Sequence, residues 1–173
     1  SWCYGNIAYQ TAWLKANYPV QYMTAVLQAT KSAPDPHERI AAAAAECVKL
    51  GIEMLPPDIN ESDDNFSVAS IEPGAYAIRF GLGVVKNVGS SAVEGIIRSR
   101  QAEGGYKDIE DFCKRADLSG ANSRTIEHLA MAGAFSSAVP GESRRTLVVA
   151  AERIMQVARD ERDILGRERR VEG

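Results

Sequence analysis

The residues best suited to bind an anion lie in one short stretch of the chain. From Leu82 to Arg100 it reads Leu-Gly-Val-Val-Lys-Asn-Val-Gly-Ser-Ser-Ala-Val-Glu-Gly-Ile-Ile-Arg-Ser-Arg. Asn87 and Gly89 are residue types that tolerate left-handed backbone angles, which predicts a tight turn between two helices. Such a turn leaves consecutive backbone N–H groups unpaired at the start of the second helix. Those amides and the helix dipole can together hold a phosphate group.

Several side chains around this turn could complete a phosphate site. Hydroxyl and basic groups flank the turn, and its central apolar residue is expected to anchor it in the core. The candidate phosphate-binding residues here are Lys86, Asn87, Val88, Gly89, Ser90, Ser91, Arg98 and Arg100. Contacts of this kind read the nucleic-acid backbone and not the bases, so binding should be independent of DNA sequence.

The arrangement resembles the helix-hairpin-helix motif, whose turn usually reads Gly-hydrophobic-Gly. Asn87 stands where the first glycine is usual, and its side chain falls close to the expected phosphate position. A second, weaker hairpin is predicted between helices over 108–116 and 123–132, with Arg124 as its best contact residue. Its turn is irregular, so it is expected to support packing more than to hold phosphate. The alternative is that both hairpins are purely structural. Local charge favours DNA, because residues 76–103 carry 4 basic and 2 acidic side chains.

Other patterns that could do chemistry fail on spacing. Asp58, Asn60 and Ser62 begin like a calcium loop, but Asp63 and Ala69 stand where such a loop needs Gly and Glu, so a solvated Asx-rich turn is expected. A Gly-x-Gly pair after a predicted strand lacks the third glycine of a dinucleotide site. Acid pairs, a Ser/His/Asp set and metal-ligand spacing are not found, and both histidines are isolated. We therefore predict no catalytic residue and no metal site in this chain.

The composition is that of an ordinary globular protein. The 173 residues are 45% hydrophobic and 25% charged, with a net charge of −3, which excludes a strongly basic coating protein. The total hides a gradient, since residues 1–75 carry 4 basic and 9 acidic side chains. Three distant cysteines fit a reduced, cytoplasmic protein, and no apolar stretch approaches the ~20 residues of a membrane span. A start at Ser1 inside an aromatic-rich pattern suggests a segment of a longer protein.

Hydrophobic spacing predicts a mainly α-helical fold with one small β-hairpin. A helical region over 7–30 is expected to break at Pro19, and a helix from residue 36 to Leu50 should begin at an Asp35 N-cap and end at Gly51. A polar, Pro-rich connection follows. Strands are then expected over 66–69 and 75–80, and helices over 82–86, 90–102, 108–116, 123–132 and 143–166. The last helix should begin at a Ser143 cap and carry an apolar stripe of Leu147, Ala151, Ile154, Ala158 and Leu165. The two hairpins among these elements would position the phosphate site.

Several longer motifs also stand in a fixed order along the chain. They are Ala-Tyr-Gln-Thr-Ala-Trp-Leu-Lys-Ala-Asn-Tyr-Pro at 8–19, Leu-Pro-Pro-Asp-Ile-Asn-Glu-Ser at 55–62, Ile-Arg-Phe-Gly-Leu-Gly at 78–83, Lys-Asn-Val-Gly at 86–89 and Ala-Gly-Ala-Phe at 132–135. In this order and spacing they are similar to the bacterial C-family replicative DNA polymerases, the alpha subunits of DNA polymerase III.

The resemblance implies a division of labour. Residues 1–55 would be the C-terminal part of the polymerase fingers, 56–142 a tandem helix-hairpin-helix DNA-binding domain, and 143–173 a C-terminal helix and linker. Duplex primer–template DNA would be gripped without sequence specificity, next to the remainder of the polymerase chain. The family's catalytic aspartates and Mg²⁺ belong to the palm, which no position here matches, so no cofactor is expected in this chain. A neighbouring region would bind the sliding clamp.

Two other functions compete with this interpretation. One is a helix-hairpin-helix module of a DNA repair protein, and the motif over 8–19 argues against it. The other is a structural, protein-binding helical domain without DNA contact. The parent protein of the favoured interpretation would be a nucleotidyltransferase.

Overall fold

The computed structural model describes the backbone of residues 2–31 and 33–171, and the side chains of residues 4–31 and 33–164. Seven α-helices, one 3₁₀ turn and three short strands make up this described part, so the fold is mainly α-helical, as predicted. The chain divides into two compact units, residues 1–55 with 65–80 and residues 56–64 with 81–173. The second unit differs from the expected domain over 56–142, because it excludes the β-hairpin and includes the C-terminal helix.

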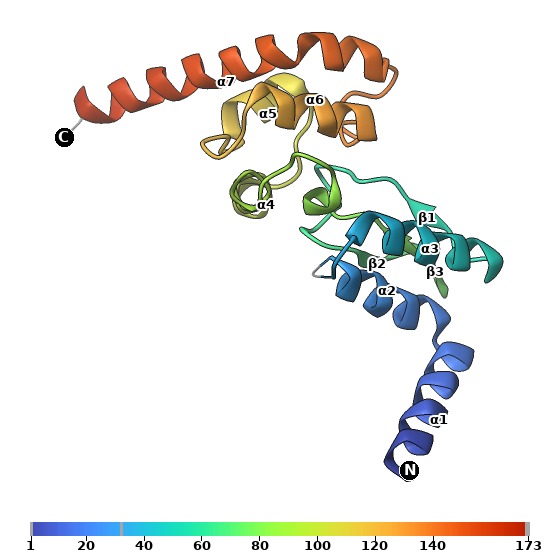
Figure 1. The fold of residues 1–173 in the computed structure, drawn as a ribbon. Coiled ribbons are helices and arrows are strands. Elements are labelled where there is room, and N and C mark those ends of the chain that lie inside the picture. Colours follow the sequence, from blue (N-terminus) through green and yellow to red (C-terminus); the bar gives the residue numbers. More distant parts are fainter. Residues whose placement is uncertain (1, 32, 172–173) are drawn as a thin grey trace. The chain divides into compact units, whose positions relative to one another are not determined.

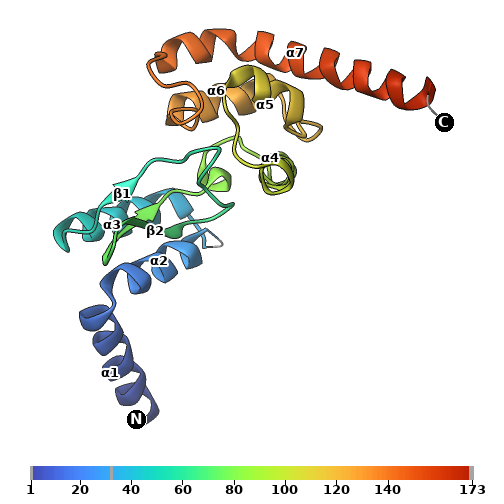
Figure 2. The ribbon, with the colours of Figure 1, turned by 180° about the vertical axis from the view of Figure 1, so that it is seen from behind.

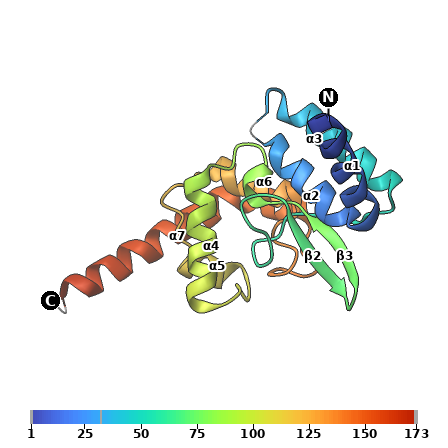
Figure 3. The ribbon, with the colours of Figure 1, turned by 90° about the horizontal axis from the view of Figure 1, so that it is seen from below.

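Strand pairing explains why the β-hairpin belongs to the first unit. β2 (Ser67–Glu72) and β3 (Ala75–Arg79) pair antiparallel, and β1 (Met54–Leu55) adds parallel to β3, which gives the order β1-β3-β2. The β2–β3 ribbon is seen in Figure 3. A main-chain hydrogen bond of 2.9 Å from Ile78 N to Glu53 O continues the pairing. β1 was not predicted, because two residues form a strand only when another strand lies beside them.

The first unit also contains three helices, α1 (Trp2–Asn17), α2 (Pro19–Thr30) and α3 (Pro36–Lys49), of which α2 and α3 contact the sheet (Figure 1). Pro19 occupies the first turn of α2, so the predicted break is confirmed. Gly51 follows α3 with φ of +70°, the left-handed conformation that commonly ends a helix. The predicted side-chain cap at Asp35 is wrong. Asp35 has a left-handed backbone, with φ of +54° where an N-cap is usually extended, and its carboxylate accepts no capping hydrogen bond.

The first unit has its own small core. Its fully or almost fully buried members include Met23, Leu27, Cys47, Phe66 and Ile78. The Phe66 and Phe80 rings pack with centroids 4.8 Å apart. At the surface, Lys15 of α1 pairs with Glu46 of α3, and this hydrogen bond raises the pKa of Lys15 and lowers that of Glu46.

The second unit consists of η1 (Leu82–Val84), α4 (Ser90–Glu103), α5 (Ile109–Arg115), α6 (Ser123–Ala132) and α7 (Arg144–Val171). In Figure 1 and Figure 2, α7 lies along α5 and α6. The helix expected over 82–86 is only a 3₁₀ turn, because Val85 is already extended. Phe112 and Phe135 are fully buried, with their rings edge to face at 5.2 Å, and form the centre of the core.

The long α7 contributes one face to that core. Its side chains Leu147, Ala151, Ile154 and Ala158 are buried, which confirms the predicted apolar stripe. Leu165, also assigned to the stripe, lies outside the described side chains. The predicted cap is confirmed as well, since Ser143 Oγ accepts a hydrogen bond of 3.1 Å from Thr146 N.

Candidate nucleic-acid interface

The first hairpin turn runs from Val85 to Gly89 and links η1 to α4. Val88 N donates to Val85 O at 3.2 Å and closes the turn. Asn87 has φ of +62°, so the prediction of a left-handed asparagine is confirmed. Gly89 differs from the expectation, since its φ of −80° and ψ of 150° suit any residue. Val88 packs against the core, as predicted.

The start of α4 is open. Gly89 is the N-cap residue and offers no side-chain acceptor, while its carbonyl accepts from Ala92 N and Val93 N at 3.1 and 3.2 Å. Within the part of the chain that the structure describes, the N–H groups of Gly89, Ser90 and Ser91 have no hydrogen-bond acceptor. Three consecutive free amides at the positive end of a helix of 14 residues are a ready site for an anion.

The start of α6, at the second hairpin, is closed by its own side chains. Asn122 Oδ1 accepts from Thr125 N at 2.9 Å, and Thr125 Oγ1 in turn accepts from Asn122 N at 3.5 Å. This capping box occupies amides that would otherwise face an anion. The two hairpins are therefore not equivalent: the first is open to a phosphate, and the second satisfies itself.

The second hairpin turn packs against α4. A Cβ added at Gly95 of α4 would stand 2.1 Å from Asp117 O, and one added at Gly120 would stand 2.2 Å from Ser91 Oγ. Both contacts require glycine, because a Cβ cannot occupy such a distance. The prediction that the second turn supports packing is thereby confirmed, and the two hairpins form one tandem unit.

The basic candidates differ in what they face. Lys86 and Arg124 are exposed, and Arg124 precedes Thr125, whose hydroxyl reaches Asn87 O at 3.4 Å. Arg98 is exposed farther along α4, near Asp117. Hydrogen bonds from Ser119 and then the charges of Arg162 and Arg98 lower the pKa of Asp117.

Arg100 points into the protein. Its Nη1 donates to Ile59 O and Ser62 O, both at 3.0 Å, and its Nη2 lies 3.6 Å from an Asp63 carboxylate oxygen. Only 12% of its side chain is exposed. Arg100 thus holds the 56–64 segment against α4, a contact that sequence reasoning did not foresee.

Asn87 makes an unexpected side-chain contact. Its Nδ2 lies 3.0 Å from His128 Nε2, on α6. The sequence showed His128 only as an isolated histidine, because its partner is 41 residues away. The Asn87 side chain thus contacts the second hairpin, and its expected place beside a phosphate stays a prediction.

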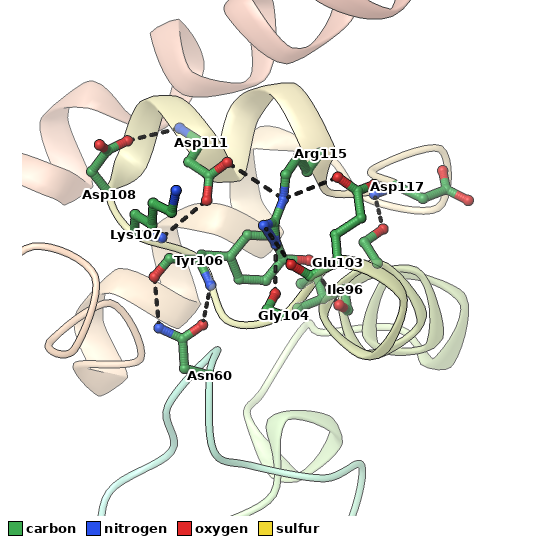
Figure 4. A network of polar contacts seen from close by, with 11 residues as sticks. Asn60, Ile96, Glu103, Gly104, Tyr106, Lys107, Asp108, Asp111, Arg115 and Asp117 are labelled. Atoms are coloured by element: carbon green, nitrogen blue, oxygen red, sulfur yellow. Dashed lines mark hydrogen bonds and ion pairs between the residues drawn. The ribbon is translucent and has the colours of Figure 1, made fainter.

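The 56–64 segment forms hydrogen bonds with the loop between α4 and α5 and with the residues that follow α6. Asn60 N donates to Asp58 Oδ1 at 2.8 Å, so the predicted Asx turn is confirmed. The turn is not solvated as expected, because Asp58 and Ser62 are buried and Asp58 accepts from Ser137 Oγ at 2.7 Å. Asn60 bonds both main-chain groups of Tyr106 (Figure 4), at 2.9 Å to O and 2.6 Å from N.

Tyr106 joins this segment to the core. Its hydroxyl donates to Ile96 O at 2.8 Å, and the Arg115 guanidinium lies 5.0 Å from its ring centroid. Burial raises the pKa of Tyr106 to about 12. Arg115 also contacts Asp111 and Glu103 (Figure 4). These contacts hold the loop between α4 and α5 in place. Because this loop follows α4 directly, they also help to hold α4, whose first amides are unpaired.

The described residues contain no group of three or more His, Cys, Asp or Glu side chains placed to hold a metal ion. Among the same residues, none of the helices is both long and apolar enough to cross a membrane.

The family of the chain follows from comparison with known proteins. The family model described as the helix-hairpin-helix motif matches residues 51–147, more than half of the chain. The protein therefore belongs to the helix-hairpin-helix family, in agreement with the two hairpins of the second unit.

Curated relatives narrow the comparison to one kind of protein. The chain is 41% identical over 144 residues to DNA polymerase III subunit alpha of Mycobacterium tuberculosis, and the aligned region covers 83% of this chain and 11% of that protein. It is 42% identical over 134 residues to the subunit of Deinococcus radiodurans, with 78% and 9% covered. The Vibrio cholerae subunit is 40% identical over 137 residues, with 79% and 11% covered. The expected resemblance is confirmed, and the chain spans about a tenth of these relatives' length.

Proposed function

We propose that this chain binds duplex DNA without sequence specificity, through phosphate contacts at the first hairpin, as part of a bacterial replicative polymerase. The observation that carries the proposal is the open start of α4, where the amides of the exposed residues Gly89, Ser90 and Ser91 are unpaired, shortly after the exposed Lys86 in the chain. A phosphate there would accept hydrogen bonds from the backbone and gain from the helix dipole. Arg124 and Arg98, both exposed, would add positive charge to the same unit.

The relatives support a role for this chain within a larger polymerase. In a DNA polymerase, such a segment would hold the primer–template duplex in line while the enzyme slides along it. The remainder of the polymerase chain would supply the palm, with its Mg²⁺ and nucleotidyltransferase chemistry, and a neighbouring region would bind the sliding clamp. The protein would work in the cytoplasm, where bacterial DNA is copied. A DNA repair module is less favoured, since the relatives described above are polymerase subunits.

A salt-dependent DNA titration tests this proposal. Fluorescence anisotropy of a labelled duplex should give a logarithmic affinity that falls linearly with the logarithm of salt concentration, with a slope of roughly −0.9 for each phosphate neutralised. Lys86→Ala should make that slope less steep by about one. Lys49→Ala is the matched control, because Lys49 is also exposed but lies in the first unit. Equal effects of the two substitutions, or no binding at low salt, would contradict the proposal.

A proline substitution isolates the contribution of the backbone. Ser90 is the first residue of α4, a position that favours proline, and Gly89 before it is already extended as proline requires. Ser90→Pro should therefore leave the helix intact and remove one outward N–H group and the hydroxyl. Ser90→Ala removes only the hydroxyl. We expect Ser90→Pro to weaken DNA binding clearly more than Ser90→Ala, with unchanged circular dichroism. Identical affinities of the two variants would mean that this amide does not bind phosphate.

A further inference from the structure

Asn87 is one of two non-glycine residues with a positive φ among the described residues. At φ of +62° a glycine fits without strain, whereas a residue with a Cβ is disfavoured there. Asparagine is among the better tolerated types, but it still brings a side chain to a turn that faces outward. A function of that side chain would account for its presence.

Both polar groups of Asn87 that lie toward α6 are bound to it. The side-chain Nδ2 lies 3.0 Å from His128 Nε2, and the main-chain O accepts from Thr125 Oγ1 at 3.4 Å. Thr125 and His128 are three residues apart, so they lie on the same face of α6. The first turn is thus held by two contacts to a single helix of the second hairpin.

The α6 side of this contact is anchored by burial and by hydrogen bonds. Thr125 is 2% exposed, and its hydroxyl belongs to the capping box with Asn122. His128 is half-buried and comes from the next turn of the same helix. A partner anchored in this way can fix the position of Asn87, and Asn87 in turn lies two residues before the N-cap of α4.

We propose that His128 is a positioning residue for phosphate binding: it holds the Asn87 side chain and thereby keeps the first turn, and the open amides of α4, in the geometry that receives DNA. The inference rests on the proposed function. It gives the second hairpin a role without phosphate contact of its own, as the anchor of the first. It also explains why asparagine can replace the usual glycine, since glycine cannot bind His128.

The Asn87–His128 hydrogen bond can form with either tautomer of the His128 ring, because the Asn87 amide can donate or accept. A neutral imidazole with a free Nε2 accepts from the Asn87 amide group, and a ring that carries hydrogen on Nε2 donates to the Asn87 carbonyl oxygen after an amide flip. Glutamine at position 128 could make the same hydrogen bond, whereas alanine could not. This difference supplies a conservative rescue.

A double-mutant cycle on DNA affinity tests the inference with the full chain. His128→Ala should weaken binding of a labelled duplex at fixed salt by about threefold to tenfold, and His128→Gln should restore most of the loss. Asn87→Gly, which suits the left-handed backbone and so should fold normally, should cause a similar loss. His128→Ala in the Asn87→Gly background should then have no further effect. Circular dichroism and thermal unfolding verify that each variant is folded.

Long-range ¹H–¹⁵N spectra provide a direct readout of the contact. The ring-nitrogen signals of His128 should shift on Asn87→Gly, because the hydrogen-bond partner is lost. The inference would be overturned if His128→Ala bound DNA with wild-type affinity. It would also be overturned if His128→Ala caused the same loss of affinity in the wild-type and the Asn87→Gly backgrounds, since His128 would then touch DNA itself. If Lys86→Ala and Ser90→Pro weaken binding while His128→Ala does not, only this inference fails. If all of these variants bind as wild type does, the proposed function fails.

Discussion

Single arginines on α4 show how much side-chain direction matters. Arg98 and Arg100 are two residues apart and chemically identical, yet Arg98 is exposed and Arg100 donates to two main-chain carbonyls. The local sequence does not distinguish them, and both were expected to bind phosphate. Only the position of the 56–64 segment decides that one of them is used for internal contacts.

This difference predicts opposite results for one substitution at the two sites. Arg100→Met should lower the free energy of unfolding by about 1–3 kcal/mol, because the Ile59 and Ser62 carbonyls lose a charged donor. Arg98→Met should change it by less than about 0.5 kcal/mol, as expected for an exposed site. Urea unfolding measures both. If Arg100→Met left stability unchanged and made the salt slope of DNA binding less steep, Arg100 would be a phosphate ligand after all.

Elements pack closely where glycine allows it. Gly95 lies in the interior of α4, where alanine is normally preferred. The 116–120 segment of the second hairpin rests on this position, so that a Cβ there would stand 2.1 Å from Asp117 O. Close approach of the two hairpins therefore depends on a residue that weakens the isolated helix.

At Gly95, the usual preference of a helix interior for alanine over glycine should be reversed. Gly95→Ala should lower the thermal midpoint, with a cost of about 1–3 kcal/mol from the backbone clash. Gly5, inside α1, has no neighbouring atom within 4 Å of an added Cβ. Gly5→Ala should be neutral or raise the midpoint, in line with a gain of about 0.5–1 kcal/mol. Thermal unfolding followed by circular dichroism compares the two, and a stabilised Gly95→Ala variant would show that the hairpins do not pack this closely.

Across the whole molecule, the two compact units divide the charged residues differently from the sequence segments 1–75 and 76–103. The first unit, residues 1–55 with 65–80, carries 5 basic and 5 acidic residues. The acidity seen over 1–75 comes from residues 56–64, which hold four carboxylates and belong to the second unit. Among them, Asp58 accepts a hydrogen bond from Ser137 and Asp63 pairs with Arg100. These carboxylates therefore help to hold the 56–64 segment against the hairpins.

The second unit should lose stability at alkaline pH. Burial raises the pKa of Cys113 to about 11 and that of Tyr106 to about 12, from ordinary values of 9.0 and 10.0. Both groups ionise at lower pH in the unfolded chain, which therefore loses protons first. Their contribution to stability is complete below pH 9 and is lost as the pH rises through 11 and 12.

Unfolding midpoints measured from pH 8 upward should show this decline. Tyr106→Phe should reduce the part above pH 10, and Cys113→Ala the part between 9 and 11. Both variants are expected to start from a lower midpoint at neutral pH, because Tyr106 loses its hydrogen bond to Ile96 O and Cys113 leaves a small cavity. A wild-type midpoint that stays constant up to pH 12 would contradict the assigned pKa shifts.

Local spacing was sufficient for much of this fold. The break at Pro19, the end of α3 at Gly51, the left-handed turn at Asn87 and the helices of the second hairpin were all predicted, because each depends on residues within a few positions of one another. The proposed phosphate site could be expected for the same reason, since a turn and a helix start are local features. The Asp35 cap failed because its own backbone angle, also local, was not apparent from residue types.

Residue spacing by itself determined that the chain is mainly helical, that it contains a hairpin fit for phosphate, and which family it resembles. Tertiary structure alone decided that β1 joins β3, that Arg100 points inward and that His128 holds Asn87. The pairs Arg100–Ile59 and Asn87–His128 are each 41 residues apart, and nothing in the chain near either partner specifies the other. Such contacts form only when the packed core brings the elements together.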